Sequence, residues 1–258
     1  MTPGTGPVAR QPGIGDAVLV TGAASGIGRG VAARFAHAGW HVLALDRDAA
    51  RLTAVWGPGG SDAAAGGPVT PVAADITDAA ALTAALRGTG TAALRACVNV
   101  AGVYPASTFL DFSYDDYRLN FDVNVLGTLT ASRAALPYLR AASAATIVNF
   151  ASTAAFAPGD GRRILYKAAK AAVVAITRSM AFELAAERIA VVGVAPGPVE
   201  TEGSAAYGDI GRFAGSVPLG RNGTPADMAA WVWALAGSNP LPFITGETIV
   251  VSGGAFMR

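Results

Sequence analysis

The chain has 258 residues, enough for one large globular domain or two small ones, and 52% of them are hydrophobic while 14% are charged. Its 19 basic and 18 acidic residues nearly cancel, and no run of lysines and arginines supplies the basic patch that binding to nucleic acids or anionic membranes needs. Its longest apolar stretches, such as 171–176, are far too short to span a bilayer, so the expected partners are small molecules and further copies of the chain.

Residues 1–15, rich in proline and glycine, are expected to form a disordered tail and lack the apolar segment of a secretory signal. From residue 16 onward, short apolar runs typical of strands alternate with longer alanine-rich runs typical of helices. The predicted elements are, in chain order, a strand at 16–20, a helix at 27–38 ending at Gly39, a strand at 41–45, a helix at 49–56, a surface loop at 57–68, a strand at 69–73, a helix at 78–86, a strand at 95–100, a long helix at 114–139, a strand at 145–150, a second long helix at 165–187, a strand at 189–194, an irregular stretch at 196–223, a helix that Thr224 caps and Pro225 begins, and a strand at 248–251. This alternation predicts an α/β fold of one domain, with a doubly wound, seven-stranded parallel sheet and helices on both faces.

A glycine-rich turn, 21–28, lies between the first predicted strand and the first helix. In a doubly wound sheet this turn binds phosphate, because glycines allow the backbone to approach the ligand and the helix start offers free N–H groups. A glycine-rich turn alone is weak evidence, since tight turns need glycine for other reasons. Its position, together with Asp46 at the end of the second strand, indicates a dinucleotide site.

Asp46 favours NAD over NADP, because a carboxylate there accepts hydrogen bonds from the ribose hydroxyls and repels a 2′-phosphate. Arg47 is the counterargument, since an arginine can pair with that phosphate; the alternative is a solvated side chain. Asp75, after the third strand, is placed either to accept from the adenine amino group or to cap the next helix, a task for which Asp78 is better placed.

Tyr166 and Lys170 are four residues apart on a predicted helix and therefore share one face. The chain has only two lysines, Lys167 and Lys170. An ammonium about 4 Å from a phenol would lower its pKa enough to make it an acid/base at neutral pH, although such a pair is usually just a surface pair. Ser152 strengthens the catalytic interpretation, because it ends the fifth strand at the sheet edge where such folds hold ligands; the alternative is a serine bonded to backbone.

These motifs, with Asn99-Val100-Ala101-Gly102, Asn124 and the segment Pro196–Thr201, make an ordered set that resembles the short-chain dehydrogenase/reductase family. The resemblance covers residues 16–254 and implies a Rossmann fold forming an NAD(P)-binding catalytic domain over 16–258. Two departures, Val100 for an asparagine and Ser252 for an aspartate, do not touch the chemistry. The interval between Ser152 and Tyr166 is one residue longer than usual, which places an insertion at 158–163 over the expected substrate pocket.

The resemblance implies a role for each matching residue. Tyr166 would be the general acid/base, Lys170 would lower its pKa and bind the nicotinamide ribose, Ser152 would orient the substrate oxygen, and Asn124 would distort the long helix and hold a water of a proton relay. Asn99 and Gly102 would shape the turn near the adenosine, and Pro196, Gly197, Val199 and Thr201 would cradle the nicotinamide. The expected cofactor-binding residues are Gly22, Ser25, Gly26, Ile27, Gly28, Asp46, Arg47, Asp75, Ile76, Asn99, Ala101, Gly102, Tyr166, Lys170, Pro196, Gly197, Val199 and Thr201. No metal ligands are expected.

The sequence does not identify the substrate. Candidate pocket residues are Tyr104, Ala154, Ile164, Leu165, Pro198, Tyr207 and Phe213, and the segment 202–217 is either a lid or a plain surface loop. Arg162 and Arg163 would meet an acidic substrate or a neighbouring subunit.

The expected function is hydride transfer between NAD(H) and a secondary alcohol or ketone. The alternatives are an NADPH-dependent 3-oxoacyl thioester reductase and a non-catalytic dinucleotide sensor, which would not need the proton-transfer residues. The family resemblance implies dimers or tetramers formed through the two long helices. A single cysteine, Cys97, excludes an internal disulfide framework and a thiolate metal cluster, and fits a cytoplasmic location.

Overall fold

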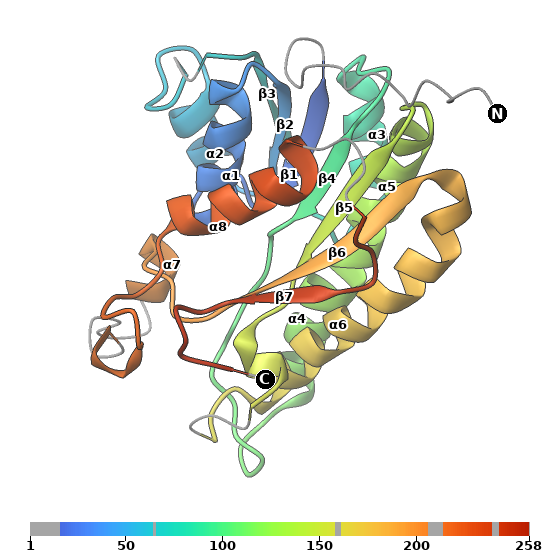
Figure 1. The fold of residues 1–258 in the computed structure, drawn as a ribbon. Helices are drawn as coiled ribbons and strands as arrows, with labels where there is room; N and C mark the ends of the chain where they lie inside the picture. The colour runs from blue at the N-terminus through green and yellow to red at the C-terminus, as the bar shows by residue number, and fades with distance from the viewer. Residues whose placement is uncertain (1–15, 64–65, 158–160, 206–213, 239–242, 258) are drawn as a thin grey trace, which may run out of the picture.

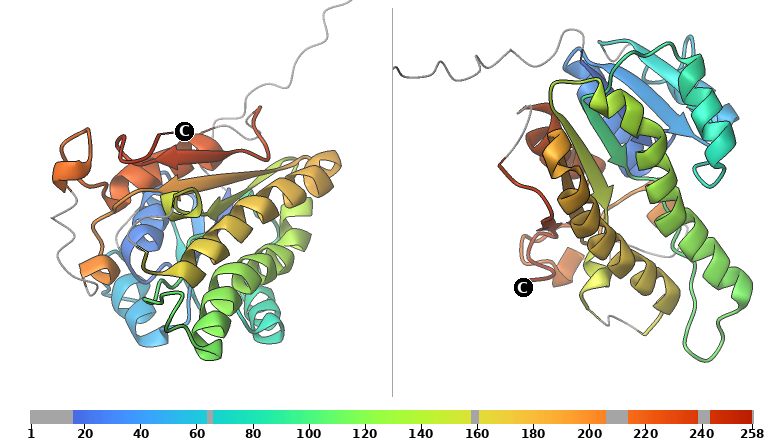
Figure 2. Two further views of the ribbon diagram at one scale, coloured as in Figure 1. Left: turned by 90° about the horizontal axis from the view of Figure 1, so that it is seen from below. Right: turned by 90° about the vertical axis from the view of Figure 1, so that its right-hand side faces the viewer.

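The computed structural model describes residues 16–63, 66–157, 161–205, 214–238 and 243–257 (Figures 1 and 2). The predicted tail at 1–15 lies outside the described residues, as do Tyr207, Phe213 and part of the insertion at 158–163. Within the described part of the chain, no helix is long and apolar enough to cross a membrane.

Seven parallel strands form one sheet in the order β3-β2-β1-β4-β5-β6-β7. Their bounds are β1 (Ala17–Thr21), β2 (His41–Asp46), β3 (Val69–Ala73), β4 (Ala96–Asn99), β5 (Ala145–Phe150), β6 (Ile189–Pro196) and β7 (Thr248–Val251). The predicted doubly wound fold is confirmed. Because β1 lies between β2 and β4, the chain reverses its direction across the sheet there, which opens a crevice at the carboxyl ends of these strands.

The helices are α1 (Gly26–His37), α2 (Ala49–Trp56), α3 (Ala79–Gly88), α4 (Tyr114–Phe121), α5 (Gly127–Arg140), α6 (Ile164–Leu184), α7 (Glu202–Ala205) and α8 (Pro225–Val232). The apolar faces of α1, α2 and α8 cover one side of the sheet through residues such as Phe35, Leu52 and Val232. On the other side, α3, α5 and α6 pack through Leu82, Ala135 and Ala181. Burial on both faces explains why the strands read as continuous apolar runs.

Helix ends follow the predicted capping residues. Asp78 accepts hydrogen bonds from the N–H groups of Ala80 and Ala81 at the start of α3. Thr224 and Asp227 form a reciprocal capping box at α8, and Pro225 occupies its first turn.

Two predicted stretches need correction. The helix predicted over 114–139 is not uniformly α-helical, because a π-helical turn, Asp122–Leu126, separates α4 from α5. Asn124 is buried in this turn, so the helix is distorted where the family resemblance implied. The stretch predicted to be irregular at 196–223 contains the short helix α7.

Candidate active site

The glycine-rich turn after β1 is packed backbone against backbone. Oγ1 of Thr21 accepts hydrogen bonds from the N–H groups of Val100 and Ala101, and so ties the end of β1 to the end of β4. A Cβ on Gly22, whose φ is 69°, would lie 3.0 Å from Cα of Ala101. A Cβ on Gly28 would lie 2.1 Å from the carbonyl oxygen of Gly22. Only glycine permits this close turn, which brings the N-terminus of α1 to the sheet edge.

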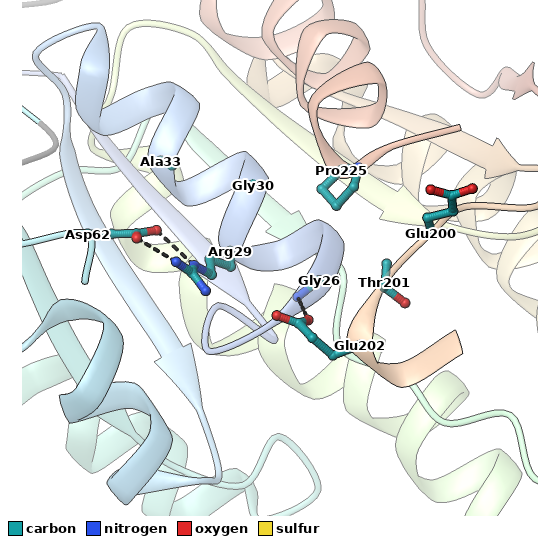
Figure 3. Close-up of a pocket in the computed structure, with 9 residues that line it drawn as sticks. All are labelled: Gly26, Arg29, Gly30, Ala33, Asp62, Glu200, Thr201, Glu202 and Pro225. Carbon is teal, nitrogen blue, oxygen red and sulfur yellow. Dashed lines mark hydrogen bonds and ion pairs between the residues drawn. The ribbon is translucent and has the colours of Figure 1, made fainter. Parts of the chain in front are cut away.

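The first turn of α1 is where helix N–H groups without a partner inside the helix can bind an anion. Its N-cap, Ser25, has extended backbone and makes no side-chain cap. The N–H of Gly26 instead donates to Oε2 of Glu202, 3.0 Å away (Figure 3). Ile27 packs against the core below the turn. A carboxylate therefore stands where this geometry would bind the pyrophosphate of a dinucleotide, so the turn fits such a ligand.

Asp46 is held rigidly at the end of β2. Its Oδ2 accepts from the N–H of Ala24 and its Oδ1 from the N–H of Asp48, both at 3.1 Å. Each carboxylate oxygen keeps a second lone pair, so both can also accept ribose hydroxyls. Arg47 beside it is exposed.

Of the residues after β3, Asp75 closes a local turn, because its Oδ1 accepts from the N–H and the hydroxyl of Thr77 at 2.8 Å. Capping of α3 falls to Asp78, as the sequence analysis favoured. The side chain of Ile76 is buried, and its Cδ1 lies so close to Gly127 that a Cβ there would be 2.5 Å away. Ile76 therefore faces the core with its side chain and can meet a cofactor only through its backbone.

Tyr166, on the first turn of α6, lies beside Ser152 and Tyr104. The Tyr104 and Tyr166 rings meet edge to face, with centroids 6.0 Å apart. Burial raises the pKa of the Tyr166 phenol above its usual value; a hydrogen bond with Ser152 works to lower this pKa, Tyr104 to raise it and the charge of Arg163 to lower it. The Ser152 oxygen also accepts from the N–H of Ala154 at 3.1 Å, which leaves its hydroxyl proton for Tyr166.

Lys170 lies one helical turn beyond Tyr166 and is buried. Its Nζ donates to the carbonyl oxygen of Phe150 at 2.8 Å and lies 5.8 Å from the centroid of the Tyr166 ring. Burial lowers the pKa of Lys170 to about 8. Burial is the largest influence on the Tyr166 pKa in this structure, and the role expected for Lys170, to lower that pKa, stays a prediction.

Asn124 and Gly102 lie next to Lys170. The Asn124 amide donates to the carbonyl oxygens of Val103 and Asn120, both at 2.9 Å, and accepts from the N–H of Val103. A Cβ on Gly102 would lie 2.7 Å from Oδ1 of Asn124 and 3.4 Å from Nζ of Lys170. The structure thus brings Asn124 to the Lys170 side of the site and requires a glycine between them.

A buried polar network, which the sequence analysis missed, lies beneath the site. The amide of Asn99 donates to Oγ of Ser132 at 2.8 Å and to Oδ1 of Asn149 at 2.9 Å, and the amide of Asn149 donates to Oγ1 of Thr177 at 3.0 Å. The side chain of Asn99 therefore points into the fold, where it joins β4 to α5 and β5. The signal for Asn149 was an amide side chain in the strand Ala145–Phe150, whose other residues are apolar except for Thr146.

The expected nicotinamide cradle follows β6. Pro196 ends the strand. Gly197 packs so closely on the neighbouring segment that a Cβ added to it would lie 2.8 Å from Cβ of Ser252. Val199 is buried and forms a parallel bridge with Gly223. Thr201 reaches α1, where a Cβ on Gly26 would lie 3.2 Å from its Cγ2. The segment therefore lies across the opening of the glycine-rich turn.

A pocket of about 520 Å³ continues outward from this opening (Figure 3). It is lined by Gly26, Arg29, Gly30, Ala33, Asp62, Glu200, Thr201, Glu202 and Pro225. Arg29 binds Asp62 through two bonds of 2.6 and 2.8 Å. Among the described residues, no group of three or more histidine, cysteine, aspartate or glutamate side chains is placed to hold a metal ion.

The fold and site define an α/β protein whose dinucleotide-type phosphate loop faces a Ser-Tyr-Lys cluster across the carboxyl edge of one sheet. A family model described as short chain dehydrogenase matches residues 16–209. The chain belongs to the short-chain dehydrogenase/reductase family of oxidoreductases. Members of this family bind a nicotinamide dinucleotide and act on small-molecule substrates.

Relatives carry several activities. The chain is 32% identical to the 2-keto-3-deoxy-L-fuconate dehydrogenase of Xanthomonas campestris pv. campestris, over 93% of this chain and 80% of that protein. It is 33% identical to the galactitol 2-dehydrogenase of Cereibacter sphaeroides, over 93% and 94%. The structure of a 3-oxoacyl-[acyl-carrier protein] reductase with bound NAD from Brucella melitensis has a TM-score of 0.84 and 31% identity, over 95% of this chain and 92% of that one.

Proposed function

We propose that the protein transfers a hydride between NAD(H) and a secondary alcohol or ketone, with Tyr166 as general acid/base. The observation that supports this most is the cluster at the end of β5, where the Tyr166 hydroxyl bonds to Ser152 while buried Lys170 lies on the same helix face. A dinucleotide sensor would need none of these groups. The same cluster also argues for activity on a hydroxyl or carbonyl carbon.

Bound NAD would accept the hydride from the carbinol carbon. The chain's own residues then have to hold the substrate oxygen and move one proton. The Ser152 hydroxyl orients the oxygen, and Tyr166 takes its proton during oxidation or returns it during reduction. Lys170, with a pKa of about 8, keeps most of its positive charge at pH 7 and favours the phenolate when the site is closed to water.

NAD is the proposed cofactor because of Asp46. Its carboxylate is fixed by the N–H groups of Ala24 and Asp48, so it cannot turn away from a 2′-phosphate without losing both bonds. NADP remains the alternative through exposed Arg47.

The first test is a fluorescence titration of the pure protein with NADH and with NADPH. We expect NADH to bind at least about tenfold more tightly than NADPH. Binding NADPH would bring its 2′-phosphate out of water and against the Asp46 carboxylate, and the repulsion of these two negative charges costs more than about 1.4 kcal/mol. That result would direct a substrate screen toward alcohols, polyols and hydroxy acids. Tighter NADPH binding would contradict the NAD proposal and would favour a second candidate, NADPH-dependent reduction of 3-oxoacyl thioesters. The similarity to the Brucella reductase supports that reaction but not the use of NADPH, because the Brucella structure contains NAD.

We also propose a homodimer or homotetramer formed through α4, α5 and α6, which lie side by side on one face (Figure 2). Apolar side chains are exposed there, among them Leu126, Leu129 and Phe182. Sedimentation at micromolar concentration should give a dimer or tetramer, and an active monomer would contradict this assembly.

A cytoplasmic location is proposed from Cys97. Burial raises the pKa of this thiol to about 12, which keeps it unreactive, and the sequence holds no second cysteine for an internal disulfide.

A further inference from the structure

The carboxylate of Glu202 lies in a site built for an anion. Glu202 opens α7, and its Oε2 accepts the hydrogen bond from the N–H of Gly26 at the N-terminus of α1 (Figure 3). Its Oε1 lies 3.9 Å from Nη2 of Arg51 on α2. Its charge also acts on Arg29, whose pKa is raised chiefly by the hydrogen bond to Asp62 and further by Glu202. A helix N-terminus and two guanidinium groups thus surround one carboxylate.

The pyrophosphate of a dinucleotide is an anion that binds to the same kind of helix N-terminus. The N–H of Gly26 has one proton to donate, and Glu202 already accepts it. We propose that Glu202 is an internal anion that closes the pyrophosphate site and has to leave Gly26 before a dinucleotide can bind. This proposal rests on the proposed dinucleotide function. It adds that displacing Glu202 from Gly26 costs free energy and so weakens dinucleotide binding.

Glu202 is carried by a compact segment, Thr201–Ser204. The N–H of Thr201 donates to Oγ of Ser204 at 2.9 Å, and the N–H of Ser204 donates to Oγ1 of Thr201 at 3.0 Å. These reciprocal bonds fix the turn on which Glu202 projects. Glu202 therefore reaches Gly26 from a defined position rather than as a freely rotating surface side chain.

The same segment touches the catalytic side of the site. A Cβ on Gly203 would lie 2.5 Å from Oη of Tyr104, whose ring packs against Tyr166. Gly203 therefore packs the segment against Tyr104, which limits the positions from which Glu202 can reach Gly26.

Glu200 provides a matched control. It lines the same pocket and carries the same charge two residues earlier in the chain. Its Oε1 accepts from the amide of Asn222 at 3.2 Å, whereas the Gly26 N–H is bonded to Glu202. Glu200→Gln therefore removes a negative charge from the same pocket and leaves the bond between Gly26 and Glu202 in place.

The experiment compares the wild type, Glu202→Gln, Glu202→Ala and Glu200→Gln. Each is titrated with NADH by fluorescence, and with ADP-ribose and adenosine by calorimetry. ADP-ribose carries the pyrophosphate without the nicotinamide, and adenosine carries neither. We expect Glu202→Ala to bind NADH and ADP-ribose about fivefold more tightly, which is the worth of one charge at an exposed helix end. Glu202→Gln should gain less, because its amide oxygen can still accept the hydrogen bond from the Gly26 N–H. Adenosine affinity should stay within about twofold in every variant, and Glu200→Gln should resemble the wild type.

Three results would overturn the proposal: unchanged NADH and ADP-ribose affinity in both Glu202 variants, an equal gain in Glu200→Gln, or an equal gain for adenosine. Melting curves check that each variant is folded; the Glu202 side chain is 52% exposed, so its replacement leaves no cavity. If neither the wild type nor any variant binds NADH or ADP-ribose, the proposed dinucleotide function fails and this proposal fails with it. Binding by the wild type without a change in the Glu202 variants overturns this proposal alone.

Discussion

Replacing Tyr166 with phenylalanine is expected to lower turnover about a thousandfold, within the range that a general acid/base supplies, while NADH affinity stays within about twofold. The substitution removes only the hydroxyl. The ring still packs edge to face on Tyr104, and Lys170 keeps its bond to the Phe150 carbonyl. The measurement is kcat with the best alcohol from the substrate screen, together with an NADH titration of the same preparation.

Tyr104→Phe is the matched variant for this prediction, because it removes the neighbouring phenol hydroxyl from the same ring pair. A Tyr166→Phe enzyme that keeps more than about a tenth of the wild-type rate would overturn the assignment. Loss of turnover in Tyr104→Phe with retention in Tyr166→Phe would transfer the acid/base role to Tyr104. Loss of NADH binding in Tyr166→Phe would mean that the hydroxyl serves the cofactor site.

Burial and charge act against each other at Tyr166. Desolvation raises the pKa of the phenol, while the Ser152 hydrogen bond and the charge of Arg163 work to lower it. Spacing along a helix predicts that Tyr166 and Lys170 share a face, but it does not predict how far each group is withdrawn from water. The sequence therefore predicts that the two side chains share a helix face, but it does not predict that burial raises the pKa of the phenol in this structure.

Residues whose role depends on strand ends and turns were predictable. The alternation of apolar runs places Asp46 and Ser152 at the carboxyl edge of the sheet, where the structure has them. Gly22 and Gly28 lie where any Cβ would contact backbone atoms, which explains why both positions are glycine. These features follow from local pattern and from one general rule about parallel sheets.

Contacts between segments far apart in the chain were not predictable. Glu202 meets Gly26 across 176 residues, and Asn149 meets Asn99 across 50. Neither contact leaves a periodic signal, because each depends on the exact direction of one side chain in the folded protein. The polar network at Asn149 is also hidden in a strand whose other residues are almost all apolar.

Replacing Asp46 with asparagine is expected to reverse the preference between NADH and NADPH. The carboxylate is proposed to accept two ribose hydroxyls in charge-assisted bonds, each worth about 1.5–3 kcal/mol. Its loss should weaken NADH binding about tenfold or more. The same change removes the negative charge that would face a 2′-phosphate, so NADPH should bind more tightly and the affinity ratio should change by about a hundredfold. Paired fluorescence titrations of the wild type and the variant measure this ratio.

Asp48→Asn is the control for Asp46→Asn. Asp48 carries the same charge two residues away and caps α2 by accepting from the N–H of Arg51 at 2.9 Å, so its replacement tests the general field without touching the end of β2. An unchanged ratio in Asp46→Asn, or an equal change in Asp48→Asn, would show that Asp46 does not select the cofactor.

Arg47→Ala separates the remaining alternative: if exposed Arg47 binds a 2′-phosphate, this variant loses NADPH affinity and keeps its NADH affinity. If Asp46 governs selection, Arg47→Ala leaves the preference for NADH in place, because the Asp46 carboxylate still repels the 2′-phosphate of NADPH.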